Sequence, residues 1–80
     1  MSTEDKIRGY ILENYLFTDD QSELDSSDSL LEKGIIDSTG IMELVFYLEE
    51  DFKIKVEDDE IIPENMDSVN SIVNFIDSKQ

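Results

Sequence analysis

Apolar residues recur at helical spacing in three separate segments of this chain, and this pattern restricts the possible folds more than any other feature. In the second segment, for example, Ile41, Leu44 and Leu48 follow the i, i+3, i+7 spacing of a helix that buries one face. No segment shows a convincing strand pattern. The helices that we expect, in chain order, are residues 4–17 with Thr3 as the N-cap, Ser38 to about Asp51, and a last helix capped by Asp67 or Ser68.

The connections between these segments differ in length and composition. Residues 18–37 are rich in aspartate and serine, which favour turns, and they form a long loop that ends in one turn closed by Gly34. The stretch FKIKV is expected to be extended, and residues 57–62 to form a short helical stretch that Pro63 ends or redirects. We therefore predict an all-α domain, a small helical bundle of three main helices plus a short one. All of residues 1–80 are expected to form this single domain.

Cysteine and histidine are both absent. Their absence excludes disulfides, cysteine-based zinc sites, and catalysis by a thiol or an imidazole. Paired carboxylates remain available to a hydrolase, but the sequence identifies no acid/base pair set in a pocket. We therefore assign no catalytic residue and do not expect a self-contained enzyme.

The aspartates of the long loop are spaced in a way that resembles a calcium-binding loop. Asp25, Ser27 and Ser29 occupy the alternating positions of an EF-hand, but Leu30 stands where that loop requires glycine. No glutamate occupies the twelfth position. We reject a calcium site of this type and assign no metal ligands.

Acidic residues dominate the chain, with 21 acids against 6 bases and a net charge of -15 at pH 7. Such a surface repels nucleic acids and anionic membranes, and attracts basic patches on other proteins. The N-terminal stretch MSTEDKIRGY lacks the apolar core of a signal peptide, and no apolar run approaches the roughly 20 residues of a membrane span. We expect a monomeric cytoplasmic protein that binds neither nucleic acid nor membrane. An acidic interaction module or a nucleic-acid mimic explains the charge equally well.

Asp37 and Ser38 stand side by side where the second helix begins. Both are preferred helix caps, so capping alone accounts for a typical Asp-Ser pair at such a place. A serine there is also exposed beside unpaired amides and the positive end of the helix dipole. The position alone leaves two interpretations open: Ser38 only caps the helix, or it serves as a chemical handle for another molecule.

The stretch EKGIIDSTGIMELVFYLEEDFKI resembles the modification site and recognition helix of the acyl carrier proteins and their relatives, the peptidyl and D-alanyl carriers. The resemblance covers nearly the whole chain, because DSLLEKGIIDS, MELVFYLEEDFKIKV and IIPENMDSVNSIVNFI follow one another in family order. The short family motif is Asp-Ser-Leu, and here Thr39 replaces the leucine. The DSTG form resembles the Asp-Ser-aromatic-Gly variant of D-alanyl carriers and some stand-alone biosynthetic carriers.

The resemblance implies that Ser38 accepts a 4′-phosphopantetheine arm from coenzyme A, and that Asp37 helps to present this site to a phosphopantetheinyl transferase. The arm would hold an acyl or aminoacyl group as a thioester, so the chain would be a carrier and not an enzyme. Its other partners would be enzymes that load and process the cargo in fatty acid, lipid or secondary-metabolite biosynthesis.

The resemblance also assigns a partner-binding surface to the second helix, formed by Met42, Glu43, Phe46, Glu49 and Glu50. Methionine and phenylalanine would form an adaptable apolar patch, and the glutamates would meet basic residues of the partner. From the residues alone, a wider core and a solvated acidic face explain the same pattern. We assign Ile41, Leu44, Val45, Leu48, Ile72 and Ile76 to the core, with Ile61 and Ile62 as candidate gates to a cavity.

Overall fold

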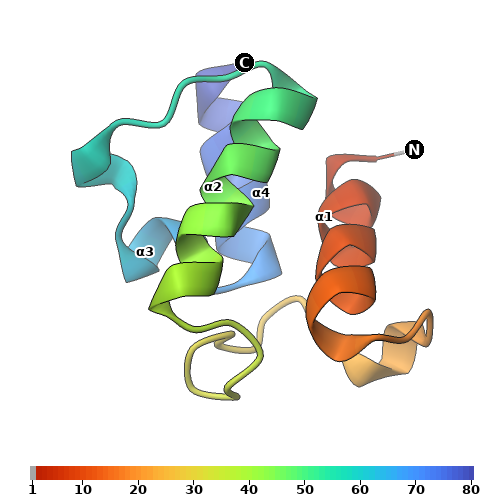
Figure 1. Ribbon diagram of the computed structural model, residues 1–80. Coiled ribbons are helices and arrows are strands. Elements are labelled where there is room, and N and C mark those ends of the chain that lie inside the picture. Colours follow the sequence, from red (N-terminus) through yellow and green to blue (C-terminus); the bar gives the residue numbers. More distant parts are fainter. Residues whose placement is uncertain (1) are drawn as a thin grey trace.

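Helices, turns and loops make up all of the chain that the computed structural model describes, residues 2–80 (Figure 1). Helices α1, α2 and α4 form the body of the bundle, and the short α3 lies beside α2. The predicted all-α bundle with three main helices and a short one is confirmed. The helices are α1 Thr3–Ile11, α2 Ser38–Phe52, α3 Pro63–Met66 and α4 Val69–Lys79, with a π-helical turn at Leu12–Leu16 and 3₁₀ turns at Gln21–Glu23 and Asp58–Glu60.

Side-chain caps determine where α1 and α4 begin. The Ser2 hydroxyl accepts a hydrogen bond from the Asp5 amide at 3.1 Å, so Ser2 is the N-cap. The expectation that Thr3 caps this helix was wrong by one residue, because the adjacent serine is an equally good cap. The Ser68 hydroxyl accepts from the Ser71 amide at 3.1 Å, which confirms one of the two expected caps of the last helix.

The first helix does not continue to residue 17 as a regular α-helix. It becomes a π-helical turn at Leu12–Leu16 and ends at Phe17, which has the left-handed backbone angle φ 56°. A π turn rotates the side chains that follow it relative to a regular helix. Here the turn ends with Tyr15 directed to the start of α2, where its hydroxyl lies 3.3 Å from the Gly40 carbonyl oxygen.

Pro63 begins a helix, so of the two expectations for this residue it redirects the chain and does not end a helix. The predicted helical stretch 57–62 shortens to the 3₁₀ turn, and α3 starts at the proline itself. Proline has no amide hydrogen and a fixed φ, so it suits the first turn of a helix, where amides lack partners. An ion pair of 2.7 Å between Lys79 Nζ and Glu60 Oε1 connects this region to the end of α4.

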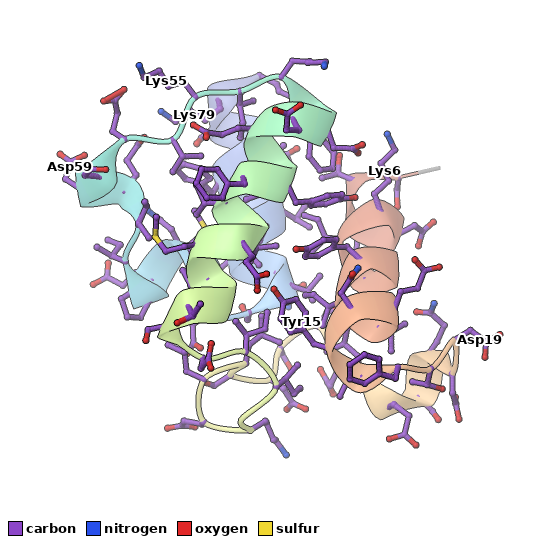
Figure 2. All side chains as sticks on the ribbon, viewed as in Figure 1. Lys6, Tyr15, Asp19, Lys55, Asp59 and Lys79 are labelled. Atoms are coloured by element: carbon purple, nitrogen blue, oxygen red, sulfur yellow. The ribbon has the colours of Figure 1, made fainter. Side chains whose placement is uncertain are left out.

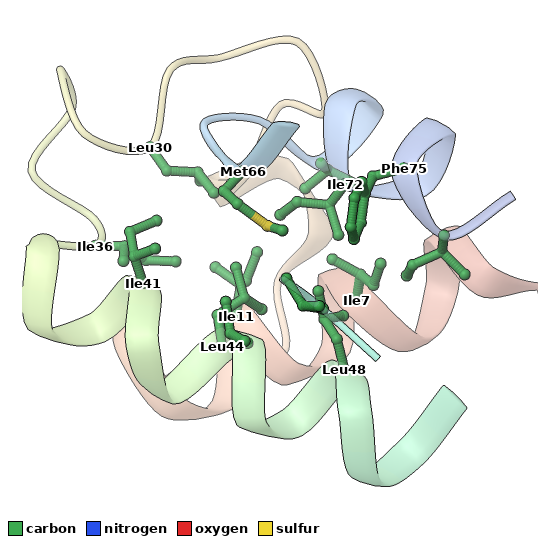
Figure 3. Packing of buried hydrophobic residues seen from close by; sticks show 14 of the residues in the cluster. Ile7, Ile11, Leu30, Ile36, Ile41, Leu44, Leu48, Met66, Ile72 and Phe75 are labelled. Carbon is green, nitrogen blue, oxygen red and sulfur yellow. The ribbon is translucent and has the colours of Figure 1, made fainter. Parts of the chain in front are cut away.

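The core collects apolar side chains from every helix and from the long loop (Figure 3). All six residues assigned to the core from the sequence are buried. The loop and the extended connector contribute Leu24, Leu30, Ile36 and Val56, which lie outside the helical pattern. Within residues 2–80 the buried apolar residues are Ile7, Ile11, Leu12, Leu24, Leu30, Ile36, Ile41, Leu44, Val45, Leu48, Val56, Met66, Val69, Ile72, Phe75 and Ile76.

Arg8 fixes the first half of the long loop to α1. Its guanidinium donates to the Gln21 side chain and the Gln21 carbonyl, both at 2.8 Å. It also donates to the Leu24 carbonyl at 2.6 Å and to the Ser26 hydroxyl at 2.7 Å. One cation therefore holds three loop residues through a planar donor group that lysine does not have.

Asp67 fixes the second half of the loop. Its carboxylate accepts from the Ser29 hydroxyl at 2.6 Å and from the Leu31 amide at 2.9 Å. Its carbonyl accepts from the Leu30 amide at 2.6 Å. The segment that leads into α2 is thus anchored to the junction of α3 and α4, although it has little regular structure.

Among the helices of residues 2–80, none is both long enough and apolar enough to cross a membrane.

Lys53 follows α2 in the left-handed conformation, with φ 57°, which is strained for any residue that carries a Cβ atom. Lys53→Gly should therefore be more stable than Lys53→Gln, which has the same charge but keeps the Cβ atom. We expect a difference of about 0.5–1 kcal/mol in the free energy of unfolding, measured by urea denaturation. Equal stability of the two variants would contradict the assigned backbone strain.

Candidate functional site

Asp37 caps helix α2, and Ser38 is its first residue. The Asp37 carboxylate accepts a hydrogen bond from the Gly40 amide at 2.7 Å, and its negative charge lies at the positive end of the helix. The Ser38 side chain is exposed. Among residues 2–80, none of the hydrogen bonds found uses the Ser38 hydroxyl. The two residues therefore have separate roles: Asp37 satisfies the helix end and leaves the serine hydroxyl available.

Gly40 is buried in the first turn of α2 and has no room for a side chain. A Cβ atom built there would lie 2.8 Å from Ile36 Cγ2 and 3.2 Å from Tyr15 Cε1. The glycine of DSTG is therefore required by close packing against the end of α1 and the residue pair before Ser38. In the sequence this glycine was only part of a resemblance, and nothing indicated its contact with Tyr15.

Tyr15 lies between the end of α1 and the start of α2 (Figure 2). Its hydroxyl is 3.3 Å from both the Gly40 carbonyl oxygen and Glu43 Oε1. Its ring meets that of Tyr10 edge to face, with centroids 5.9 Å apart. Burial, followed by the nearby Tyr10 and Glu43, raises the pKa of the Tyr15 phenol well above its usual value, so the hydroxyl stays protonated and can donate.

An apolar pocket of about 310 Å³ opens beside Ser38, between α2 and the region of α3. Ser38 is the only polar residue in its lining. The two candidate gate residues, Ile61 and Ile62, both line it, so they border a cavity that the sequence could not reveal. The full lining is Leu31, Ser38, Ile41, Met42, Ile61, Ile62, Pro63 and Met66.

Four of the five residues assigned to partner binding share the exposed face of α2. Phe46 and Met42 are 61% and 43% exposed, which is unusual for large apolar side chains, and Glu43 and Glu50 are exposed beside them. Glu49 differs, because it is half-buried and its carboxylate accepts from the Val56 amide at 3.0 Å. We call Met42, Glu43, Phe46 and Glu50 the exposed α2 face.

The site offers an exposed primary hydroxyl at a helix N-terminus, with an apolar pocket on one side. A phosphodiester on this hydroxyl would lie next to unpaired backbone amides, whose partial positive charge favours an anion. Within residues 2–80, no group of three or more acidic side chains is placed to hold a metal ion. The serine hydroxyl and the amides of the helix N-terminus together fit a covalently attached phosphate ester.

Comparison with known proteins also indicates a site for a covalently attached phosphate ester. The family described as "Phosphopantetheine attachment site" matches residues 7–76. A D-alanyl carrier protein of Streptococcus uberis is 36% identical over 80 residues, which cover 100% of this chain and 98% of that protein. The solution NMR structure of a holo acyl carrier protein from Nitrosomonas europaea superposes with a TM-score of 0.79 at 25% identity, covering 99% of this chain and 96% of the other.

The chain therefore belongs to the phosphopantetheine-attachment family of carrier proteins, whose prosthetic group is a covalently attached 4′-phosphopantetheine. The predicted family and the predicted prosthetic group are confirmed.

Gly40→Ala should destabilise the protein, although alanine is the better helix former. The added methyl group overlaps Ile36, whose buried side chain must shift to accept it, and overpacking of this kind costs about 1–3 kcal/mol. Urea denaturation measures the effect, and Gly9→Ala is the matched control. Gly9 is also helical, but a Cβ atom added there would have no neighbouring atom within 4 Å, so its alanine variant should gain about 0.5–1 kcal/mol. Stabilisation by both changes would refute the close packing at Gly40.

Proposed function

We propose that Ser38 carries the phosphopantetheine arm and that the protein is a stand-alone carrier of acyl or aminoacyl groups. The observation that supports this most is that the Ser38 hydroxyl is exposed at the first position of α2. Asp37, and not Ser38, caps this helix. When bound, the arm supplies the terminal thiol that this cysteine-free chain lacks and on which the cargo is held.

The protein's own residues would hold and present the site. Asp37 keeps the helix end in place and adds an acidic group next to the hydroxyl that a transferase must reach. Serine needs no base of its own here, because the transferase supplies the catalysis. The chain itself therefore acts as an acceptor, a tether and a docking partner, without bond chemistry on the cargo.

Two observations bear on the cargo. The relative from Streptococcus uberis is a D-alanyl carrier protein, which favours an aminoacyl group. The apolar pocket beside Ser38 favours a second candidate, an apolar acyl group that folds back against α3. We propose that the protein works in the cytoplasm as a single domain, with a phosphopantetheinyl transferase and cargo-loading enzymes as partners. Loading assays with D-alanine and with short fatty acids would separate the two cargoes.

Ser38→Ala should abolish attachment without loss of the fold. Incubation with a promiscuous phosphopantetheinyl transferase and coenzyme A should add one phosphopantetheinyl unit to the wild-type protein and none to the variant, as read by intact mass. Because Asp37 and not Ser38 caps α2, the variant should keep its circular dichroism spectrum. Ser27→Ala changes a serine of the acidic loop before α2; this variant is the control and should be modified like the wild type. Attachment to the Ser38→Ala variant would overturn the assignment.

The exposed α2 face begins one turn after Ser38, so a protein bound to it would have the modified serine at its edge. We propose that this face is where partners dock. Its glutamates would steer basic surfaces, and its apolar side chains would provide contact area. Glu49 is left out, because its carboxylate holds the Val56 amide and is committed to the fold.

The double variant Glu43→Lys/Glu50→Lys should be modified more slowly by the transferase. Charge reversal removes steering, so kcat/KM should fall at low salt, and high salt should bring the wild-type value close to that of the variant. Glu23→Lys/Asp77→Lys changes the net charge equally at exposed positions away from this face and should have little effect. Equal losses in the two double variants would mean that only net charge matters, and would contradict docking on α2.

A further inference from the structure

Tyr15 is a half-buried residue of the π turn that reaches across to the first turns of α2. The residues that it contacts, Gly40 and Glu43, are 25 and 28 positions away in the chain. Its ring lies where a side chain at residue 40 would be, and its hydroxyl lies near a carboxylate of the exposed α2 face. The ring and the hydroxyl therefore make different contacts, and a Tyr→Phe change separates them.

The hydroxyl has one proton and two acceptors. Its oxygen lies 3.3 Å from the Gly40 carbonyl oxygen and 3.3 Å from Glu43 Oε1, which is long for two-centre bonds between oxygen atoms and consistent with one shared proton. A carboxylate is the stronger acceptor, because hydrogen bonds to charged groups are stronger than those to neutral ones. Glu43 is therefore held on the side of α2 that faces α1.

An exposed glutamate without such a partner samples several rotamers, and binding must select one of them. A residue that is already held in one rotamer loses less conformational entropy on association. Glu43 is one of two glutamates on the exposed α2 face. Within the described part of the chain, Glu50 has no hydrogen bond or ion pair among those found, so the two acids of this face differ in how well they are ordered.

We propose that Tyr15 is a positioning residue for the attachment site, whose hydroxyl orients the Glu43 carboxylate for docking while its ring supports the first turn of α2 at Gly40. The proposal rests on the proposed function, in that it assumes a transferase that docks on the exposed α2 face to modify Ser38. It assigns to the end of α1 a part in recognition that the pattern of apolar residues does not indicate.

A double-mutant cycle tests this role. Tyr15→Phe keeps the ring and removes the hydroxyl, so kcat/KM for modification should fall roughly two- to tenfold, mainly through a higher KM. In a Glu43→Ala background the same change should have less than about a twofold effect, because the carboxylate that it orients is gone. Tyr47→Phe is the matched control. Tyr47 stacks on Tyr10 at 4.1 Å and its hydroxyl is 3.4 Å from the Lys6 carbonyl oxygen, and among the hydrogen bonds found within residues 2–80 it makes none to Gly40 or Glu43.

A second measurement on the unmodified protein does not depend on any transferase. The Hα–Hβ scalar couplings of Glu43 should report one dominant side-chain rotamer in the wild type and in Tyr47→Phe, and rotamer averaging in Tyr15→Phe. If the wild-type protein is not modified at all, the proposed function fails, and these couplings still decide whether Tyr15 orders Glu43.

The remaining outcomes overturn the positioning role. Unchanged kcat/KM in Tyr15→Phe would show that the hydroxyl does not contribute to docking. An equal loss with and without the Glu43 carboxylate would show that Tyr15 acts through general stability instead. Averaged Glu43 couplings in the wild type would show that the carboxylate is not held.

Discussion

The hydrogen bond of 2.7 Å from the Gly40 amide to the Asp37 carboxylate determines where α2 begins, and the site depends on that boundary. Because Asp37 occupies the cap, Ser38 becomes the first helical residue, and among residues 2–80 none of the hydrogen bonds found uses its hydroxyl. Ile36 and Tyr15 pack against Gly40 and prevent this turn from shifting. This short, closely packed turn thus leaves the Ser38 hydroxyl exposed. A chain of 80 residues buries a limited share of its surface, so the stability of the protein is modest.

The rest of the molecule holds that turn in place. The long loop has little regular structure, yet Arg8 and Asp67 fix its two halves, and Leu30 and Ile36 bury its end in the core. The acids are mostly spread over the surface, where they repel one another and attract basic partners. The loop that leads to Ser38 is therefore ordered, and the acidic surface favours brief contacts with proteins that it attracts electrostatically.

The helices were predictable because burial of one face imposes a period that the sequence displays directly. Boundaries were less predictable: Ser2 and Thr3 are equivalent caps in sequence, and Pro63 is compatible with either end of a helix. The need for glycine at position 40 and the contacts of Tyr15 were not visible, because they arise from packing: Gly40 lies against Ile36 in the preceding turn and against Tyr15, which is 25 residues earlier. The pocket beside Ser38 was not visible for the same reason, since a cavity is a property of packing.

The central claim is that the start of α2 is already formed before modification and that Ser38 accepts the arm there. Amide ¹H–¹⁵N spectra of the protein before and after enzymatic phosphopantetheinylation test it most directly. The account predicts shifts that centre on Ser38 and its neighbours in the first turn of α2, extending to pocket residues such as Ile61 and Ile62, with the rest of the spectrum unchanged. Shifts centred on the serines of residues 22–29, or a general change across α1 and α4, would contradict it.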